Sequence, residues 1–227
     1  MNDVLFELIN VEKSIIEENK EELKILKGIN LKIKKGETVA IVGPSGAGKT
    51  TLLNIMGGLD RPTKGKVIFC QKELNLLSAY ERANIRNRFM GFVFQSHNLL
   101  PEFSVIENVA MPAIIKGESF AEATKRALEI LKIIGLKDKI YQPVSNLSGG
   151  EKQLVSIARA VVMKPMVILA DEPTGNLDIK NANMISDLLI DLNKKIGTTL
   201  IIVTHNLELS LKMERRINLY GGEIKKN

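Results

Sequence analysis

The chain has 227 residues, which suits one or two domains and is ample for a sizeable hydrophobic core. Its net charge of +6 comes from lysines and arginines that alternate with acids, and the sequence has no dense basic block with interleaved aromatics, which argues against nucleic acid as a partner. No apolar run approaches the roughly 18 residues of a membrane helix, Glu17 and Glu18 stand where a signal peptide would be apolar, and the lone Cys70 suits a reducing compartment, so we expect a cytoplasmic protein.

The first hundred residues carry strand patterns separated by one helix. Alternating apolar and polar residues near the N-terminus predict two strands of antiparallel character, with a charged turn or loop between them. A short apolar run that ends at Gly43 is typical of a buried strand. The expected elements are strands at 5–9, 25–33, 38–42, 66–69 and 91–94, a charged loop at 12–22 and a helix at 49–58.

The middle of the chain is helical. Ser119 and Glu122 form a capping-box pattern, apolar residues follow at helical spacing, and Gly135 is a plausible C-cap. The apolar positions expected on helix 148–163 are Leu154, Ile157, Ala158 and Val161. Alternation then resumes, with strands at 166–170, 199–203 and 217–220 and helices at 180–196 and 206–213.

Strand–helix alternation predicts an α/β fold whose mainly parallel sheet is covered on both faces. The antiparallel strands near the N-terminus form a β-subdomain in this interpretation. We expect one domain in which 1–95 and 163–227 form the α/β core and 96–162 forms an inserted helical subdomain.

The clearest motif is a phosphate-binding loop of the form G-x-x-x-x-G-K-[ST], between a predicted strand and a predicted helix. Its residues are Gly43, Pro44, Ser45, Gly46, Ala47, Gly48, Lys49 and Thr50. Glycines let backbone N–H groups turn toward phosphates, and the helix N-terminus adds partial positive charge. Lys49 is expected to reach the β- and γ-phosphate oxygens, Thr50 to offer a hydroxyl to Mg²⁺, and Thr51 to reach the α-phosphate.

Two acids follow the apolar strand at 166–170. In phosphate-loop NTPases, an aspartate in the place of Asp171 holds Mg²⁺, usually through water. Glu172 comes next, and successive strand positions point to opposite sides, so the two need not both bind metal. We expect Glu172 to polarise the attacking water, although two acids in a surface turn before Pro173 is the alternative.

Two more polar residues follow predicted strands. Gln95 ends the strand at 91–94, where its amide oxygen could approach the metal or the water. His205 follows the strand at 199–203, which places it at the same carboxyl edge of the sheet as Asp171. It could bond the γ-phosphate or the water, although a lone histidine is more often structural.

These motifs occur in the order found in ABC transporter ATPases, and the chain resembles that family over nearly its whole length. The matching residues are Gly43 to Thr50, Gln95, Leu147-Ser148-Gly149-Gly150-Glu151, Asp171-Glu172, Gly175-Asn176-Leu177-Asp178 and His205. The resemblance implies a head-to-tail homodimer that holds ATP and Mg²⁺ between the phosphate loop of one copy and Ser148, Gly149, Gly150 and Glu151 of the other. Ser148 to Glu151 also fits an ordinary capping box, and both interpretations can hold together.

A narrower resemblance is to the ATPases of bacterial lipoprotein-releasing systems, in the larger MacB-like group. It rests on Phe92-Val93-Phe94-Gln95, the stretches 98–103 and 107–112, and Leu169 to Asp178. It implies peripheral attachment to integral membrane permease subunits at the cytoplasmic face of the inner membrane. Three residues depart from the pattern: Ile15 stands where an aromatic often stacks on adenine, Leu154 where many relatives carry arginine, and Asn206 where aspartate is common.

Several alternatives remain open at the level of sequence. Within transport they are a MacB-like exporter of peptides or drugs and the cell-division ATPase FtsE. From another class, a DNA-repair ATPase would need a long coiled coil between the two nucleotide motifs, and no sustained heptads are present. A soluble iron–sulfur assembly ATPase is the last alternative, and the match over 98–112 argues against it.

Overall fold

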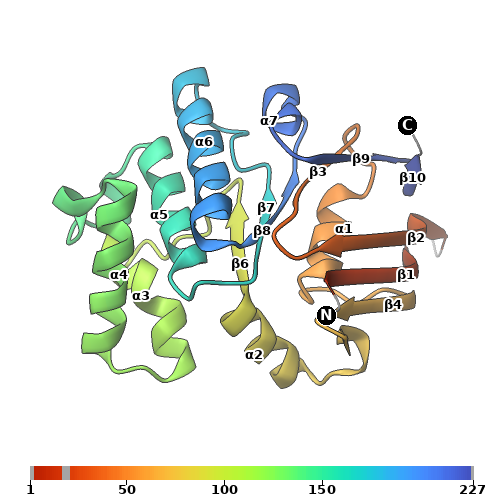
Figure 1. The fold of residues 1–227 in the computed structure, drawn as a ribbon, viewed down its shortest axis with the longest axis horizontal. Helices are drawn as coiled ribbons and strands as arrows, with labels where there is room; N and C mark the ends of the chain where they lie inside the picture. Colours follow the sequence, from red (N-terminus) through yellow and green to blue (C-terminus); the bar gives the residue numbers. More distant parts are fainter. Residues whose placement is uncertain (1–2, 17–20, 226–227) are drawn as a thin grey trace. The chain divides into compact units, whose positions relative to one another are not determined.

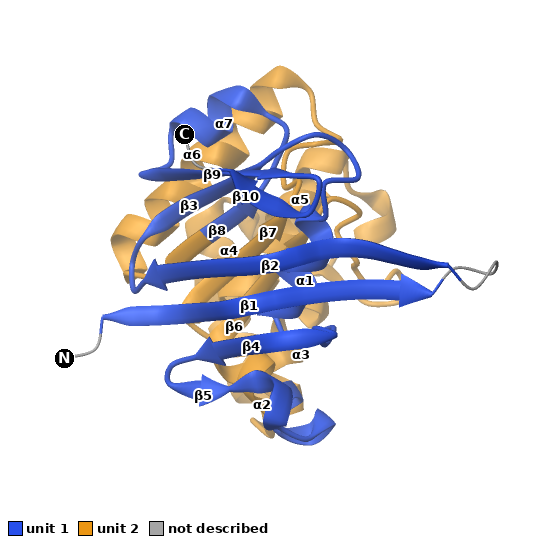
Figure 2. Cartoon of the chain, turned by 90° about the vertical axis from the view of Figure 1, so that its right-hand side faces the viewer, with its two compact units in different colours: residues 1–83, 201–227 blue, residues 84–200 orange. Residues whose placement is uncertain are grey.

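The computed structural model describes residues 3–16 and 21–225. The chain divides into two compact units, one formed by Met1–Ala83 with Ile201–Asn227 and the other by Asn84–Leu200 (Figure 2). The two units have other bounds than the expected core and helical subdomain at 96–162. That expected division stays a prediction.

The first unit opens with an antiparallel sheet in the order β2-β1-β4-β5 (Figure 2). Its long strands β1 (Val4–Ile16) and β2 (Glu22–Lys34) are joined by β4 (Lys64–Phe69) and the short β5 (Lys72–Glu73). Phe6 and Phe69 pack with ring centroids 4.9 Å apart in its core. The predicted antiparallel β-subdomain is confirmed.

The charged loop expected at 12–22 is wrong at both ends, because β1 continues to Ile16 and β2 begins at Glu22, and residues 17–20 of that expected loop lie outside the described residues. The charged residues of this stretch pair with opposite charges on facing strands and on the segment before β4. Glu12 stands opposite Lys27 and forms an ion pair with Lys64 at 3.7 Å, and Lys13 bonds Asp60 at 2.7 Å. Opposite charges on facing strands stabilise a sheet, so charge alone does not end a strand.

The same unit contains a second run of strands in the order β10-β9-β3-β8. β3 (Thr38–Val42) pairs in parallel with β9 (Arg215–Tyr220), and β10 (Glu223–Lys225) returns antiparallel to β9. The helices of the unit are α1 (Lys49–Met56), the 3-10 turn η1 (Leu74–Leu76) and α7 (Leu207–Leu211). Strand β10 was not predicted from the sequence, although Gly221 and Gly222, both with positive φ, form the turn before it.

β8 (Thr199–Val203) belongs to both units, with Thr199 and Leu200 in the second. There the order is β8-β7-β6, and β7 (Val167–Asp171) pairs in parallel with β6 (Met90–Phe94). All five residues of β8 are buried, which explains its unbroken apolar run. The predicted mainly parallel sheet is confirmed.

Helices make up most of the second unit (Figure 1). They are α3 (Val105–Lys116), α4 (Phe120–Ile134), α5 (Gly149–Val161) and α6 (Ile179–Ile196), with 3-10 turns η2 (Lys137–Lys139) and η3 (Val144–Asn146). The helices predicted between the Ser119 cap and Gly135, at 148–163 and at 180–196 are confirmed as α4, α5 and α6. Two helices were not predicted, α3 and α2 (Ala79–Phe89), although each starts with a serine and a glutamate in a capping box.

Helix α5 packs closely on strand β6. A Cβ on Gly91 would lie 2.3 Å from the backbone oxygen of Ala160, so only glycine permits this approach. The expected apolar face of α5 needs one correction, because Gln153 is buried while Leu154 is only half-buried. Gln153 tolerates burial because its amide donates to the Pro173 carbonyl at 2.8 Å.

Candidate nucleotide site

The phosphate loop joins β3 to α1 in the first unit, and its glycines are required by geometry. Gly46 and Gly48 have φ of 77° and 95°, in the left-handed region. A Cβ on Gly43 would lie 2.0 Å from the Leu219 carbonyl oxygen of β9. The loop therefore follows a path that alanine cannot take at these positions, and it leads directly into the first turn of α1.

Lys49 and Thr50 open helix α1, as the motif predicts. The Lys49 ammonium donates to the Gly43 and Pro44 carbonyls, both at 2.9 Å, so the side chain lies across the loop. Thr50 is exposed and Thr51 is half-buried. The N-cap of α1 is Gly48, which has no side chain to bond the first-turn N–H groups. Those N–H groups and Lys49 together favour an anion.

His205 belongs to the same unit as this loop. The backbone N–H of Thr204 donates to the Ile41 carbonyl of β3 at 3.2 Å, two residues before Gly43. His205 itself is exposed, and Asn206 caps α7 by accepting from the Leu209 N–H at 3.0 Å. Aspartate, which is common at this position in the family, would cap a helix equally well. Asparagine at position 206 therefore leaves this turn intact.

The second unit brings together the other polar residues that follow strands. Asp171 of β7 stands beside Phe94 of β6 in the parallel register, so Gln95 and Glu172 occupy the next positions of the two strands. Asp171 and Glu172 are half-buried, whereas Gln95 is exposed. The parallel register therefore brings the ends of β6 and β7, and the residues that follow them, to one edge of the sheet.

Glu172 has a left-handed backbone, with φ of 46°. For a residue with a Cβ this conformation costs about 1–2 kcal/mol. The turn that follows fixes it: the Gly175 N–H donates to the Glu172 carbonyl at 3.0 Å, and Gln153 holds the Pro173 carbonyl. Strain held by its surroundings is a feature of functional sites, and it turns the chain sharply just after Asp171.

Gln95 is held by the segment after Glu172. Its Nε2 donates to Asn176 Oδ1 at 3.0 Å, and Asn176 Nδ2 donates back to the Gln95 carbonyl at 3.4 Å. A Cβ on Gly175 would lie 2.9 Å from Gln95 Nε2, so glycine makes room for this amide.

Helix α5 starts with the Ser148-Gly149-Gly150-Glu151 segment. Ser148 Oγ accepts from the Glu151 N–H at 3.3 Å, and Glu151 Oε2 accepts from the Ser148 N–H at 2.9 Å, which completes a capping box. Glu151 also forms an ion pair with Lys139, and this hydrogen bond, followed by those with Ser148, holds the pKa of the carboxyl below its ordinary value. Ser148 and Gly149 stay exposed at the tip.

Two functional candidates were not predicted from the sequence, because their partners are backbone atoms that no residue pattern identifies. Asn108 of α3 is fully buried, accepts from the Leu100 N–H at 2.8 Å and donates to the Leu100, Phe103 and Ser104 carbonyls. Arg159 of α5 donates to the His97 and Asn98 carbonyls. Together they fix the segment after Gln95, and only the apolar surroundings of each polar residue could have drawn attention to it.

The structure gathers the predicted residues in two groups, each within one unit. The first unit holds Gly43 to Thr51 and His205; the second holds Gln95, Asp171 and Glu172, with Ser148 to Glu151 on a separate helix of that unit. No cluster of three or more histidine, cysteine or acidic side chains suited to a metal occurs within 3–16 and 21–225. Across the same residues no helix is long and apolar enough to cross a membrane.

A glycine-rich loop with its lysine between a strand and a helix, in an α/β fold, defines a phosphate-loop NTPase. Residues 26–175 match the family model described as ABC transporter, so the chain belongs to the ABC transporter family and is an ATP-binding ATPase.

The chain is also similar to named ATP-binding proteins of this family. The chain is 53% identical over 204 residues to the lipoprotein-releasing system ATP-binding protein LolD of Nitratidesulfovibrio vulgaris, over 90% of this chain and 88% of that one. It is 47% identical to LolD of Syntrophus aciditrophicus, over 97% and 98%. Among solved structures it is similar to the dimeric ATP-binding cassette MJ0796 bound to ADP and Pi, at a TM-score of 0.91 and 43% identity, over 98% and 97%.

Proposed function

We propose that this protein is the ATPase subunit of a lipoprotein-releasing ABC transporter at the inner membrane. The observation that carries the proposal is the likeness to LolD proteins over nearly the full length of both chains, with identities of 42–53%. Helix α5 with its Ser148-Gly149-Gly150-Glu151 start and the strand-end acids Asp171 and Glu172 lie in the second unit, and the phosphate loop lies in the first.

The residues fit ATP with Mg²⁺. The Thr50 hydroxyl, the Gln95 amide oxygen and the Asp171 carboxylate are hard oxygen donors, which Mg²⁺ prefers. When bound, the ion would neutralise charge on the β- and γ-phosphates. Lys49 and the N–H groups of Gly46, Gly48 and Thr50 supply the protein's own positive potential to the same phosphates.

Hydrolysis in this proposal depends on orientation of one water molecule. The Glu172 carboxylate accepts a hydrogen bond from that water and polarises it toward the γ-phosphate. His205 donates to a γ-phosphate oxygen as charge develops there. The left-handed backbone of Glu172 supports this role, because strained residues of this kind gather at functional sites.

The second half of the site would come from another copy of the chain. Ser148 and Gly149 present a helix N-terminus at an exposed tip, with Gly150 buried behind them, and the N–H groups of this first turn are a suitable donor set for a γ-phosphate. The similar cassette MJ0796 is described as dimeric. We therefore propose a homodimer that closes on ATP and includes no nucleic acid. Ile15, exposed on β1 opposite Leu23, offers adenine apolar contact without stacking.

The membrane partner would be a pair of integral permease subunits, and the ATPase would attach to their cytoplasmic face. Purification of the tagged chain from its native membranes in mild detergent, followed by mass spectrometry, tests this. We expect a partner with few membrane helices and a large extracytoplasmic domain, together with bound lipoproteins. Such a partner without lipoproteins would favour a MacB-like exporter or FtsE-like role, and recovery of only soluble partners or DNA would contradict transport.

A further inference from the structure

Gln153 of helix α5 carries a partly bonded amide in the interior of the second unit, where only 1% of the residue is exposed. Its Nε2 donates to the Pro173 carbonyl at 2.8 Å, whereas its Oε1 is buried and has no hydrogen-bond partner within the described part of the chain. A buried acceptor of this kind costs folding free energy, because it loses its bonds to water and gains none in exchange. Methionine has a similar size and no such acceptor, so packing alone does not favour glutamine at this position.

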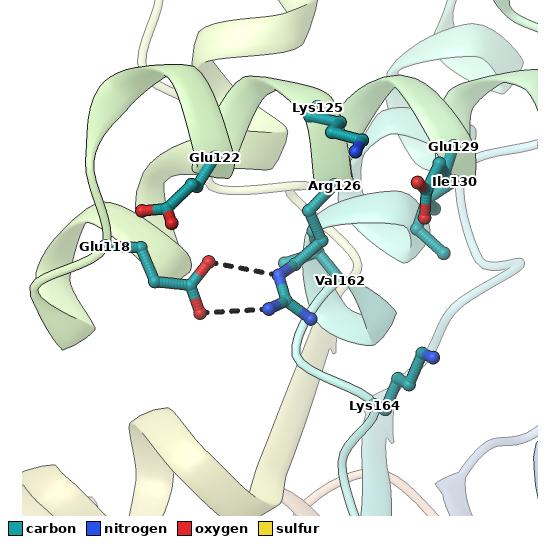
Figure 3. A pocket seen from close by; sticks show the side chains of 8 residues that line it. All are labelled: Glu118, Glu122, Lys125, Arg126, Glu129, Ile130, Val162 and Lys164. Atoms are coloured by element: carbon teal, nitrogen blue, oxygen red, sulfur yellow. Dashed lines mark hydrogen bonds and ion pairs between the residues drawn. The ribbon is translucent and has the colours of Figure 1, made fainter.

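Other polar side chains of the unit have more complete sets of partners. The buried amide of Asn108 accepts from a backbone N–H and donates to backbone carbonyls, so both of its ends are bonded. At the surface, two nitrogens of Arg126 donate to the two carboxylate oxygens of Glu118 at 3.2 and 3.0 Å, beside a pocket on α4 (Figure 3). Gln153 differs from both, because its donor end is bonded while its acceptor end is not.

The bond from Gln153 reaches the turn that contains Glu172. Glu172 has a φ of 46°, a left-handed backbone that is unfavourable for a residue with a Cβ. Asp171 before it is the last residue of β7, and Pro173 after it has a φ restricted by its ring. The Gly175 N–H donates to the Glu172 carbonyl at 3.0 Å, and Gln153 donates to the Pro173 carbonyl. Bonds to two successive carbonyls can hold a conformation that the chain does not favour by itself.

The backbone of Gln153 is itself well fixed. It lies in the second turn of α5, a regular helix that has its own capping box and continues to Val161. The buried neighbours Val155, Ile157 and Ala158 pack the same helix into the interior. A side chain that starts from a packed helix leaves little freedom to the group that it bonds. Gln153 therefore provides a fixed point against which the turn is held.

We propose that Gln153 is a positioning residue for Glu172, because its amide holds the Pro173 carbonyl and thereby keeps the turn in its left-handed conformation. In this role Gln153 acts through the backbone of the turn and not by contact with the nucleotide. The catalytic consequence rests on the proposed function, in which Glu172 polarises the attacking water. The hold on the turn is a property of the chain without nucleotide.

Urea unfolding of the full chain tests the hold on the turn without ATP. Glycine relieves the left-handed strain that alanine retains, so Glu172→Gly should unfold at a higher urea concentration than Glu172→Ala. In a Gln153→Met background the turn can relax, and the gap between the two midpoints should shrink by about half or more. Gln153→Leu gives a second apolar background in case Gln153→Met does not fold.

The control background is Lys125→Met, at an exposed position of α4 beside the pocket of Figure 3, and it should leave the gap unchanged. A gap of the same size with and without Gln153 overturns the proposal. Equal midpoints of the two position-172 variants in the otherwise unaltered chain overturn it too, because the turn would then need no support.

Steady-state kinetics test the catalytic consequence. Gln153→Met should lower kcat about tenfold with the KM for ATP nearly unchanged, because the acid is misplaced while the nucleotide is still bound. Its urea midpoint should stay near that of the wild type, since loss of the bond is offset by removal of the unpartnered acceptor. A normal kcat with a lowered midpoint would make Gln153 merely structural and overturn the positioning role. Absence of ATPase activity in the wild type contradicts the proposed function instead, and the urea comparison still decides whether Gln153 holds the turn.

Discussion

Gln95 and Asn176 bond each other across two segments that are 81 residues apart in sequence, side chain to side chain at 3.0 Å and side chain to backbone at 3.4 Å. The pair connects the end of β6 with the turn that follows Glu172. Asn176→Ala should leave the Gln95 amide without its orienting acceptor and lower kcat about tenfold, with little change in ATP affinity. Steady-state kinetics and nucleotide titration measure the two effects; an equal loss of ATP affinity would contradict this role.

Glu172→Gln should abolish turnover, by about a hundredfold or more, and retain ATP binding, because the amide cannot polarise water as a carboxylate does. The variant should accumulate as an ATP-bound dimer, which size-exclusion chromatography with Mg²⁺ and ATP detects. Normal hydrolysis by this variant would show that Glu172 is not the base.

The left-handed backbone of Glu172 predicts that glycine is more stable than alanine at this position. Glu172→Gly should be about 1 kcal/mol more stable than Glu172→Ala, because glycine adopts a φ of 46° without strain while both variants lose the carboxylate. Urea unfolding of the two variants compares them directly, and both should be inactive. Equal stabilities would mean that the turn is unstrained.

Lys49→Met removes the ammonium that lies across the phosphate loop. Nucleotide affinity should fall at least about tenfold, while the melting temperature stays within a few degrees, since the lysine bonds only two backbone carbonyls of its own loop. Fluorescent-nucleotide titration measures the affinity. Lys194→Met, on the last turn of α6, is a suitable control and should bind nucleotide normally.

Asn108→Ala should destabilise the protein by about 2 kcal/mol, because it removes a fully buried amide that bonds the Leu100 N–H and several carbonyls of the segment 100–104. Chemical denaturation gives the loss. Asn146→Ala, at an exposed turn, should cost little in comparison. A loss for Asn108→Ala no larger than for Asn146→Ala would exclude this bracing role.

The Glu151 carboxyl has a lowered pKa in the folded chain, chiefly through Lys139. A lowered acid pKa stabilises the fold above the ordinary value of 4.5, and this contribution is lost as pH falls through the folded-state pKa. Glu151→Gln should therefore be less stable than the wild type at pH 7, and the difference should disappear in the acid range below pH 4.5. A difference that is constant across this range would assign the effect to the capping bond alone.

Much of this structure can be predicted from short stretches of the sequence. The phosphate loop, the cap at Ser119 and the strand that ends in Asp171 each depend on neighbouring residues, so their patterns are readable and the structure contains the loop, helix and strand that they predict. Hydrophobic periodicity gave most helices and strands for the same reason. It failed at residues 12–16, where cross-strand ion pairs outweigh local charge, and at α2, which has no buried residue and therefore no apolar stripe.

The sequence by itself determined the chemistry: a lysine in a glycine-rich loop, two acids after an apolar strand, and a serine–glycine helix start. Only the tertiary structure decided what supports that chemistry. Arg159 reaches the His97 carbonyl from 62 positions away, Gln153 reaches Pro173 from 20 away, and Gln95 meets Asn176. These contacts depend on how helix α5 packs against β6, and no local pattern encodes which buried polar group will meet which backbone carbonyl.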